Sequence, residues 1–245
     1  THALHYGTAV FEGIRGNWNP KQDKMYVFRL KEHYERLIKG CKILNININY
    51  SVEDLCDITI NLIKESGYKE DIYIRPLAYK SEEKVANLKL HELNSDFALM
   101  IVPFGNYIDN EKPIRCQTSS WRRPHDSMMP TGVKLSGLYT TSILAKTEAT
   151  MAGFDEAILL NFDGSVSEGS GENLFMLRDG DLITPSETEN CLLGITRDCV
   201  FEIASKEFGM DITSRKIHRS EIYLADEVFL TGTAAHITSV GQLDN

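Results

Sequence analysis

Lys134 lies in a stretch of sequence whose composition suits amine chemistry. Within the segment Pro130–Tyr139 its immediate neighbours are small or apolar residues. Burial among such residues favours the neutral, nucleophilic form of a lysine amine, which Schiff-base chemistry requires. Most lysines are solvated surface charges, so a catalytic role for this one depends on the residues that accompany it.

Three short motifs come after this lysine. Glu168–Phe175 reads E-x-S-x-x-N-L-F, Leu182–Thr184 reads L-x-T, and Leu192–Arg197 reads L-x-G-I-T-R. The last motif places Ile195 and Thr196 directly after a glycine, at the predicted start of a helix. Helix N-termini present N–H groups and the positive end of the helix dipole, which together favour phosphate. This motif therefore predicts a phosphate-binding turn, although glycine-bearing helix starts are common.

The lysine and the three motifs closely resemble the signature of the fold-type IV pyridoxal-phosphate enzymes, the class IV aminotransferases. So many fixed residue types in this order rarely coincide by chance. The resemblance implies that Lys134 carries pyridoxal 5'-phosphate as an internal aldimine and moves protons as general base and acid. It also implies that Glu168 keeps the pyridine nitrogen of the cofactor protonated, because the cofactor is a strong electron sink only in that form.

The same resemblance implies further contacts with the cofactor. Tyr139 is expected to hydrogen-bond its phenolic oxygen, and Arg36 is expected to clamp its phosphate with a planar guanidinium. The remaining phosphate contacts are expected from Ile195, Thr196 and Thr233. Glu172 is expected to have a supporting or structural role.

Longer segments resemble the branched-chain aminotransferases within this family, namely His5–Arg15, Tyr73–Leu77, Ser119–Pro124 and Gly232–Ile237. This resemblance implies transamination between branched-chain L-amino acids (leucine, isoleucine and valine) and 2-oxoglutarate, which gives branched 2-oxo acids and L-glutamate. A D-amino-acid aminotransferase and an aminodeoxychorismate lyase are alternatives on the same fold, and the second and third segments disfavour both. A catalytically inactive binding protein is another alternative, against which the intact set of cofactor residues argues.

Residues of these segments are also candidates for binding the substrate. Tyr73 and Arg75 lie two apart in a predicted strand, so their side chains point to the same face. The resemblance implies that Tyr73 helps to bind the α-carboxylate, that Arg75 receives the distal carboxylate of glutamate, and that the amides of Thr233 and Ala234 face the substrate carboxylate. An aromatic wall for an aliphatic side chain is expected from Tyr6, Phe11, Tyr107 and Trp121. Aromatic residues pack cores equally well, so each of these remains open between the two roles.

Hydrophobic periodicity and turn residues predict the elements that must position these side chains. Ser51 followed by Asp54 resembles a capping box, and glycines follow several apolar stripes where helices would end. The predicted helices are Lys31–Leu44, a helix from Ser51 to Gly67, Gly137–Ala152 and Thr196–Phe208. The predicted strands are Met25–Leu30, Ile72–Tyr79, Phe97–Val102, Ala157–Asn161, Glu227–Thr231, and a hairpin of Asn173–Leu177 with Leu182–Thr184.

Turn formers and charges concentrate between two apolar runs near residues 105–113, which predicts an interdomain linker. We place the linker at 107–112, between a smaller N-terminal α/β domain (1–106) and a larger C-terminal mixed-sheet domain (113–245). The fold class is thus α+β, the two-domain fold-type IV architecture, with the cofactor expected between the domains. By comparison with the family, the first strand and the C-terminal end are expected to be missing.

The composition excludes several classes of protein. The chain has 245 residues and a formal net charge of -9, which argues against a nucleic-acid-binding surface. No stretch approaches the roughly 20 apolar residues of a membrane span. The five cysteines form no C-x-x-C pair, so neither a metal site nor a disulfide framework is expected. A reducing, cytoplasmic location is predicted, and an organellar transit peptide upstream of Thr1 remains an alternative.

The expected assembly is a homodimer or a higher homo-oligomer. The segment Tyr6–Phe11 and the strand Ile72–Tyr79 carry more apolar surface than a small domain could cover alone. The charged segment Ser81–Ser95 between two predicted strands is expected to be a loop that closes over the partner's substrate pocket and excludes water.

Overall fold

The computed structural model describes residues 1–105 and 112–244, which form two compact units. The first unit comprises Thr1–Gly105 together with Val133–Gly137, so the segment that carries Lys134 packs with the N-terminal part of the chain. The second unit comprises Asn106–Gly132 and Leu138–Asn245. None of the helices in the described ranges has the length and apolar character that crossing a bilayer needs.

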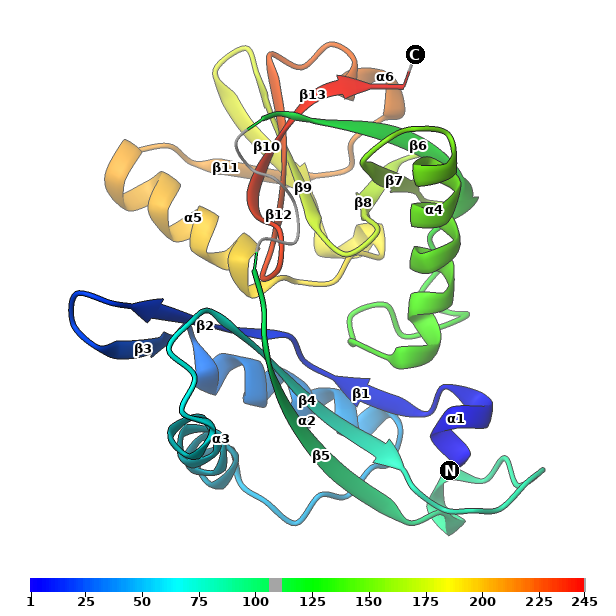
Figure 1. Cartoon of the computed structure of the whole chain (residues 1–245). Helices are drawn as coiled ribbons and strands as arrows, with labels where there is room; N and C mark the ends of the chain where they lie inside the picture. The colour runs from blue at the N-terminus through cyan, green and yellow to red at the C-terminus, as the bar shows by residue number, and fades with distance from the viewer. Residues whose placement is uncertain (106–111, 245) are drawn as a thin grey trace. The chain divides into compact units, whose positions relative to one another are not determined.

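The first unit is built on an antiparallel five-stranded sheet (Figure 1). The strand β4 lies at its centre and pairs with β1 and β2 along one edge and with β5 along the other. The strands are β1 (Ala9–Phe11), β2 (Ile14–Asn19), β3 (Lys24–Val27), β4 (Ile72–Lys80) and β5 (Ser95–Pro103). The helices are α1 (His2–Tyr6), α2 (Leu30–Ile43) and α3 (Val52–Ser66), with a short 3-10 helix η1 (Leu90–Glu92).

Burial alternates along β4, as expected for a strand with one face in the core. Ile72 and Ile74 are fully buried with Ile14 of β2, and Leu30 and Ile63 of the two longer helices pack against them. Tyr73 and Arg75 therefore lie on the opposite face, which confirms the prediction that they point the same way.

The second unit contains a mixed eight-stranded sheet in the order β11-β10-β9-β12-β13-β6-β7-β8 (Figure 1). Three of its pairs are parallel and the others are antiparallel. The strands are β6 (Ile114–Arg122), β7 (Glu156–Leu160), β8 (Val166–Gly169), β9 (Asn173–Arg178), β10 (Asp181–Pro185), β11 (Ile212–Arg215), β12 (Glu227–Gly232) and β13 (His236–Leu243). The helices are α4 (Tyr139–Met151), α5 (Ile195–Phe208) and α6 (Arg219–Ile222), with 3-10 helices η2 (Ser136–Leu138) and η3 (Glu187–Glu189).

Two helices of this unit pack on its sheet through small residues. Ala145 and Ala149 of α4 lie one turn apart and are fully buried against Leu159 of β7. Val200 and Ala204 of α5 pack in the same way against Phe175 and its neighbours. The alanine side chains at these contacts are short, which lets each helix pack closely on the sheet.

Most predicted elements are confirmed, with small differences at their ends. Ser51 and Asp54 form the predicted capping box of α3, and β9 and β10 form the predicted hairpin. The strand predicted for Met25–Leu30 is too long, because Arg29 takes a left-handed φ of 48° and Leu30 already begins α2. The strands that sequence periodicity missed are β1, β2, β6, β8, β11 and β13.

Candidate active site

Four of the predicted site residues meet in the first unit. The backbone N–H of Phe11 donates to the carbonyl oxygen of Lys134 at 3.2 Å, which ties the lysine segment to β1. Lys134 Nζ lies 5.1 Å from the centroid of the Phe11 ring, and the Arg75 guanidinium lies 4.5 Å from the same centroid. Arg75 Nη2 also donates to the Tyr73 hydroxyl at 2.8 Å. We call Phe11, Tyr73, Arg75 and Lys134 the lysine cluster.

Glycines allow the backbones around this cluster to approach closely. A Cβ on Gly13 would collide with the Tyr73 hydroxyl oxygen, so only glycine leaves room for that tyrosine. A Cβ on Gly40 of α2 would lie 2.7 Å from Val10 and 2.8 Å from Val133. The helix α2 can therefore pack against β1 and the lysine segment at once. Both positions would force a shift of their neighbours if they carried a side chain.

Arg36, the predicted phosphate clamp, is held by a buried carboxylate. Its Nε donates to Glu12 Oε1 and its Nη2 donates to Glu12 Oε2, each at 2.7 Å. His33 Nδ1 lies 2.8 Å from the same Oε2 atom. Burial by itself raises the pKa of Glu12, but the charge and hydrogen bonds of Arg36, followed by those of His33, outweigh it and lower the pKa to about 2. Glu12 is thus a carboxylate throughout the physiological range.

Glu168, the predicted partner of the pyridine nitrogen, lies at the end of β8 in the second unit and is 6% exposed. Arg123 Nη2 forms an ion pair with its Oε1 at 2.8 Å. Its Oε2 accepts from the backbone N–H of Leu192 at 2.9 Å and from the Asn173 amide at 3.2 Å. A buried cation and these donors favour the ionised carboxylate, which is the form that can hold a proton on a ring nitrogen.

Asn173 connects this carboxylate to the predicted phosphate turn. Its Oδ1 accepts from the backbone N–H of Gly194 at 3.1 Å, and its Nδ2 donates to the carbonyl of Leu192 at 2.7 Å. Gly194 is the residue before α5, so Ile195 and Thr196 form the first turn of that helix, as predicted. A Cβ on Gly194 would collide with Asn173 Oδ1, so the turn requires glycine. We call Glu168, Arg123, Asn173 and Gly194 the carboxylate cluster.

Glu172 has very different surroundings from Glu168. It is buried, and its Oε2 accepts from the backbone N–H of Gly171 at 3.0 Å. Burial raises the pKa of Glu172 well above its usual range, and the nearby carboxylate of Glu156 adds to this effect. Glu156 itself is paired with Lys146. These surroundings favour the neutral, protonated form of the Glu172 carboxyl.

The other predicted residues that the structure describes in the second unit lie at the ends of its elements. Tyr139 begins α4, and Thr233 and Ala234 form the turn between β12 and β13. Trp121, near the end of β6, is 46% exposed and so does not belong to the core of its unit. Tyr107 lies outside the described residues.

Sequence reasoning missed Arg123, Asn173, Glu12 and Phe104. The first three stood inside segments that had been singled out, but nothing in their spacing shows that Arg123 pairs with Glu168 or that Glu12 pairs with Arg36. The Phe104 ring lies 5.0 Å from that of Tyr73. A phenylalanine at the end of an apolar strand carries no signal of its own.

The two clusters fit pyridoxal 5'-phosphate by the chemistry of their donors and acceptors. The cofactor needs an amine for its aldehyde, a carboxylate for its ring nitrogen and N–H donors for its phosphate. Lys134, Glu168 and the first turn of α5 supply groups of these kinds. In addition, Arg75 Nε and Thr231 Oγ1 are buried in the described chain without a hydrogen-bond partner. The arginine nitrogen could donate to a bound molecule, and the hydroxyl could donate to one or accept from it.

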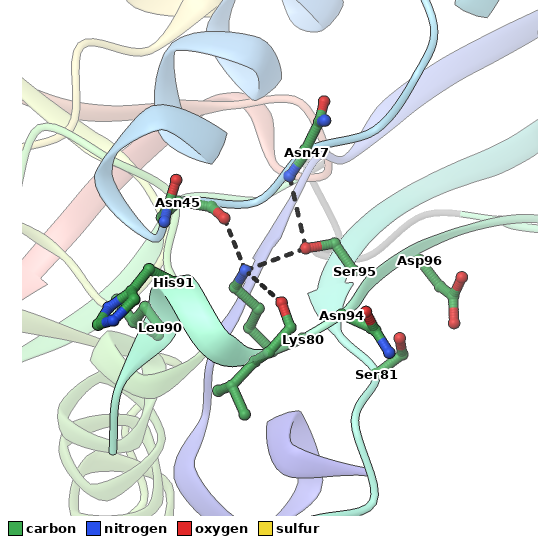
Figure 2. Close-up of a pocket in the computed structure, with 10 residues that line it drawn as sticks. Asn45, Asn47, Lys80, Ser81, Leu90, His91, Asn94, Ser95 and Asp96 are labelled. Carbon is green, nitrogen blue, oxygen red and sulfur yellow. Dashed lines mark hydrogen bonds between the residues drawn. The ribbon is translucent and has the colours of Figure 1, made fainter. Parts of the chain in front are cut away.

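A separate polar cavity of about 580 Å³ lies in the first unit, beside Lys80 (Figure 2). The Lys80 side chain is buried, and its ammonium donates to the carbonyls of Asn45 and Leu93 at 2.6 and 3.1 Å and to Ser95 Oγ at 3.1 Å. Burial lowers the pKa of Lys80. Because its three N–H bonds all go to neutral protein oxygens, this lysine ties the loop after α2 to β5 and has no donor left for a ligand.

Comparisons with known proteins agree with this chemistry over the whole chain. The profile of the amino-transferase class IV family matches residues 9–243. The probable branched-chain-amino-acid aminotransferase of Aquifex aeolicus is 49% identical over 245 residues, which cover 100% of this chain and 78% of that protein. The crystal structure of a branched-chain aminotransferase from Thermoproteus uzoniensis with norvaline is 44% identical, with a TM-score of 0.94, and covers 99% of this chain and 80% of that one. The crystal structure of the branched-chain amino acid aminotransferase from Thermobaculum terrenum in its PLP-form is 36% identical, with a TM-score of 0.93. The match covers 99% of this chain and 79% of that one.

Proposed function

The chain belongs to the class IV aminotransferases, and from that premise we propose how its residues divide the work of the reaction. The reaction is transamination of branched-chain L-amino acids with pyridoxal 5'-phosphate as cofactor. In our proposal 2-oxoglutarate accepts the amino group and becomes L-glutamate. The D-amino-acid aminotransferase and the lyase are set aside, because relatives that match almost all of this chain at 44% and 49% identity are branched-chain aminotransferases.

Glu168 is assigned to the ring nitrogen of the cofactor. When bound, pyridoxal 5'-phosphate supplies an electron sink for the negative charge that develops on the substrate Cα, and this sink is deep only while the ring nitrogen is protonated. The carboxylate of Glu168 would hold that proton. Arg123 supports the assignment, because its guanidinium keeps the carboxylate ionised and fixes its direction.

Lys134 is assigned to binding the cofactor aldehyde and then to moving a proton. Its Nζ would take the proton from the substrate Cα and return it to the C4′ carbon of the cofactor, acting first as general base and then as general acid. Arg75, whose guanidinium lies over the same Phe11 ring as Lys134, is assigned to the distal carboxylate of glutamate. The buried Arg75 Nε without a partner in the described chain supports a role in binding an anion.

The remaining assignments concern phosphate and substrate. We assign the phosphate to Arg36, to the helix start at Ile195 and Thr196, and to Thr233. Tyr139 is assigned to the phenolic oxygen. The substrate carboxylate is assigned to Tyr73 and to the amides of Thr233 and Ala234. The aromatic wall is assigned to Tyr6, Phe11, Tyr107 and Trp121.

The observation that carries the proposal is the carboxylate cluster, in which one asparagine joins the Glu168 carboxylate to the start of α5.

The test is the visible spectrum of the purified holoenzyme. Adding L-leucine without a 2-oxo acid should shift the absorbance of the bound cofactor to shorter wavelength, and D-leucine should leave it unchanged. The Lys134→Ala variant should lack the wild-type band and almost all turnover. A Lys134→Ala variant with near-normal rates, or a response to D-leucine alone, would contradict the proposal.

We also propose a homodimer. Leu4 of α1 and two residues of the 81–95 loop, Val85 and Leu88, expose 84%, 69% and 75% of their surface. The loop is held on α1, because the Ala86 N–H donates to the Tyr6 hydroxyl at 3.0 Å and a ring nitrogen of His2 lies 2.9 Å from the Asn87 carbonyl. Exposed apolar side chains on a charged loop that is held in place in this way support burial against a second copy of the chain. The free state of all five cysteines supports a reducing compartment such as the cytoplasm.

A further inference from the structure

Glu12 is the most completely buried charged group beside the lysine cluster. It follows β1, its relative exposure is 0%, and its backbone N–H donates to the carbonyl of Pro76 at 2.9 Å. The next residue, Gly13, has no room for a side chain beside Tyr73. The position of the Glu12 carboxylate is therefore set by the sheet.

The carboxylate faces two side chains of one helix. His33 and Arg36 lie three residues apart on α2, so both reach the same point from one face of the helix. Glu12 Oε1 accepts one N–H of Arg36, and Oε2 accepts a second N–H of Arg36 and faces His33. Burial lowers the pKa of His33 against the opposing effect of Glu12, and the charges of Arg36 and Lys134 lower it further. A neutral His33 would then donate from Nδ1.

This arrangement restricts the guanidinium more than a surface ion pair would. Two of the five N–H bonds of Arg36, on its Nε edge, point at a fixed buried carboxylate, so the plane and the direction of the group are determined. The Arg36 side chain is 18% exposed, whereas those of Glu12 and His33 are 0% and 2% exposed. The arginine side chain is thus more accessible than the two buried groups that hold it.

We infer that Glu12, supported by His33, is a positioning residue that directs the Arg36 guanidinium toward the cofactor phosphate. This inference rests on the proposed role of Arg36 as the phosphate clamp. A buried ion pair adds little to stability compared with a well-packed apolar pair. This arrangement therefore contributes more to the orientation of the Arg36 guanidinium than to the stability of the fold. The phosphate would meet a donor whose direction is already set, which lowers the entropy lost on binding.

The test compares two aldehydes that differ only in the phosphate. The apoprotein is titrated with pyridoxal 5'-phosphate and with pyridoxal. The dissociation constant of pyridoxal divided by that of pyridoxal 5'-phosphate measures the contribution of the phosphate. Glu12→Gln keeps the shape of the side chain and removes its charge. We expect it to reduce that ratio by about tenfold, the size typical of a hydrogen bond to a charged group, with the affinity for pyridoxal unchanged. Arg36→Gln should reduce the ratio at least as much, and the double variant should be no worse than Arg36→Gln alone.

Two further variants separate positioning from charge and from folding. Glu12→Asp keeps the charge but shortens the side chain by one methylene, so it should also reduce the ratio, and it serves if Glu12→Gln does not fold. Glu221→Gln is a matched control, because Glu221 forms a comparable two-point pair with Arg215 in the second unit. It should leave both dissociation constants as they are.

The outcomes distinguish the inference from the assignment beneath it. If Arg36→Gln leaves the ratio unchanged, the phosphate clamp itself is wrong. If Arg36→Gln reduces the ratio but both Glu12 variants leave it intact, the clamp stands and the positioning role is overturned. Equal weakening of both aldehydes by Glu12→Gln, with a lower melting temperature, would mean a structural role only and would also overturn the inference.

Discussion

Glu168 and Glu172 lie four residues apart in one motif, and the structure surrounds them with opposite electrostatics. Glu168 faces a buried arginine and accepts two further hydrogen bonds, whereas Glu172 faces another carboxylate and accepts a bond from one backbone amide. The surroundings of Glu168 therefore favour its ionised form, whereas those of Glu172 raise the pKa of its carboxyl. The sequence pattern shows two glutamates, but only the packing of their neighbours tells them apart.

For Glu168, the conservative change to glutamine tests its charge. Glu168→Gln should still bind the cofactor, because the lysine and the phosphate contacts are untouched. Turnover should fall by about two orders of magnitude or more, since the amide cannot hold a proton on the ring nitrogen. Single-turnover rates with L-leucine and the affinity for the cofactor are the measurements. A wild-type rate would mean that another group supplies the charge.

For Glu172, the prediction concerns stability and pH. In the unfolded chain this carboxyl titrates near 4.5, whereas in the folded protein its pKa is raised by burial and by Glu156, with smaller influences from Lys146 and Glu168. Its favourable contribution is therefore complete below pH 4.5 and is lost as the pH rises through the folded-state pKa. Glu172→Gln is neutral at every pH, so it should match the wild type near pH 4.5 and melt about 5 °C higher at about pH 9.

Calorimetry at a series of pH values checks the sign of this pH dependence. The difference in melting temperature between the variant and the wild type should grow with pH. A difference that stays constant, or that shrinks as the pH rises, would show that Glu172 is ionised in the folded protein.

At the scale of elements, local rules predicted the regular parts of the fold, including β4 and β9, and missed several short or polar strands, among them β1 and β8. The helix α3 has a capping box, an apolar stripe and a terminal glycine, and all three were visible in the sequence. The strand β8 reads Val-Ser-Glu-Gly and is buried along its length. Glu168 belongs to the carboxylate cluster, and Ser167 Oγ donates to the carbonyl of Glu189 at 2.7 Å. Polar residues in a short strand break the alternation on which prediction depends.

The same limit applies to the lysine segment. Val133–Gly137 packs with residues that precede it by about a hundred positions, through Val10, Gly40 and the carbonyl of Gly7. No local pattern reports such a long-range contact. The motifs could therefore identify Lys134 and Glu168 as candidates, but not the pairing of Glu12 with Arg36 or of Arg123 with Glu168 that orients the site.

The cap of α3 gives a prediction at this scale. Ser51 Oγ accepts from the Asp54 N–H at 3.0 Å, and Asp54 accepts from the Ser51 N–H at 2.9 Å. Ser51→Ala should lower the free energy of unfolding by about 1 kcal/mol, because both bonds of the box depend on this geometry. Urea unfolding of the holoenzyme is the measurement, and Ser51→Asp, which keeps an acceptor at this position, is the control. Equal stability of the alanine variant would show that the box contributes nothing in this protein.

At the scale of the whole molecule, the proposed dimer predicts how a substitution of an exposed apolar residue on the 81–95 loop changes assembly. Leu88→Asp puts a charge at a position that is 75% exposed in the single chain, so it should cost a monomer almost nothing. In a dimer that buries this loop, the charge should raise the dissociation constant by at least about tenfold. Sedimentation at micromolar concentration, with Lys89→Asp on the same loop as a control, measures the change. A wild-type protein that sediments as a monomer while turning over leucine would contradict the dimer.

The hydrogen bonds by which Lys80 joins the loop after α2 to β5 also have a use in the laboratory. Its amine is surrounded by protein oxygens, so a reagent that acylates primary amines should modify the exposed lysines quickly and Lys80 only when the loop after α2 separates from β5 (Figure 2). The acylation rate of this one residue, followed by peptide mass spectrometry, would then report how often the first unit opens locally under native conditions. Lys80 can thus serve as a chemical probe of local unfolding in the first unit.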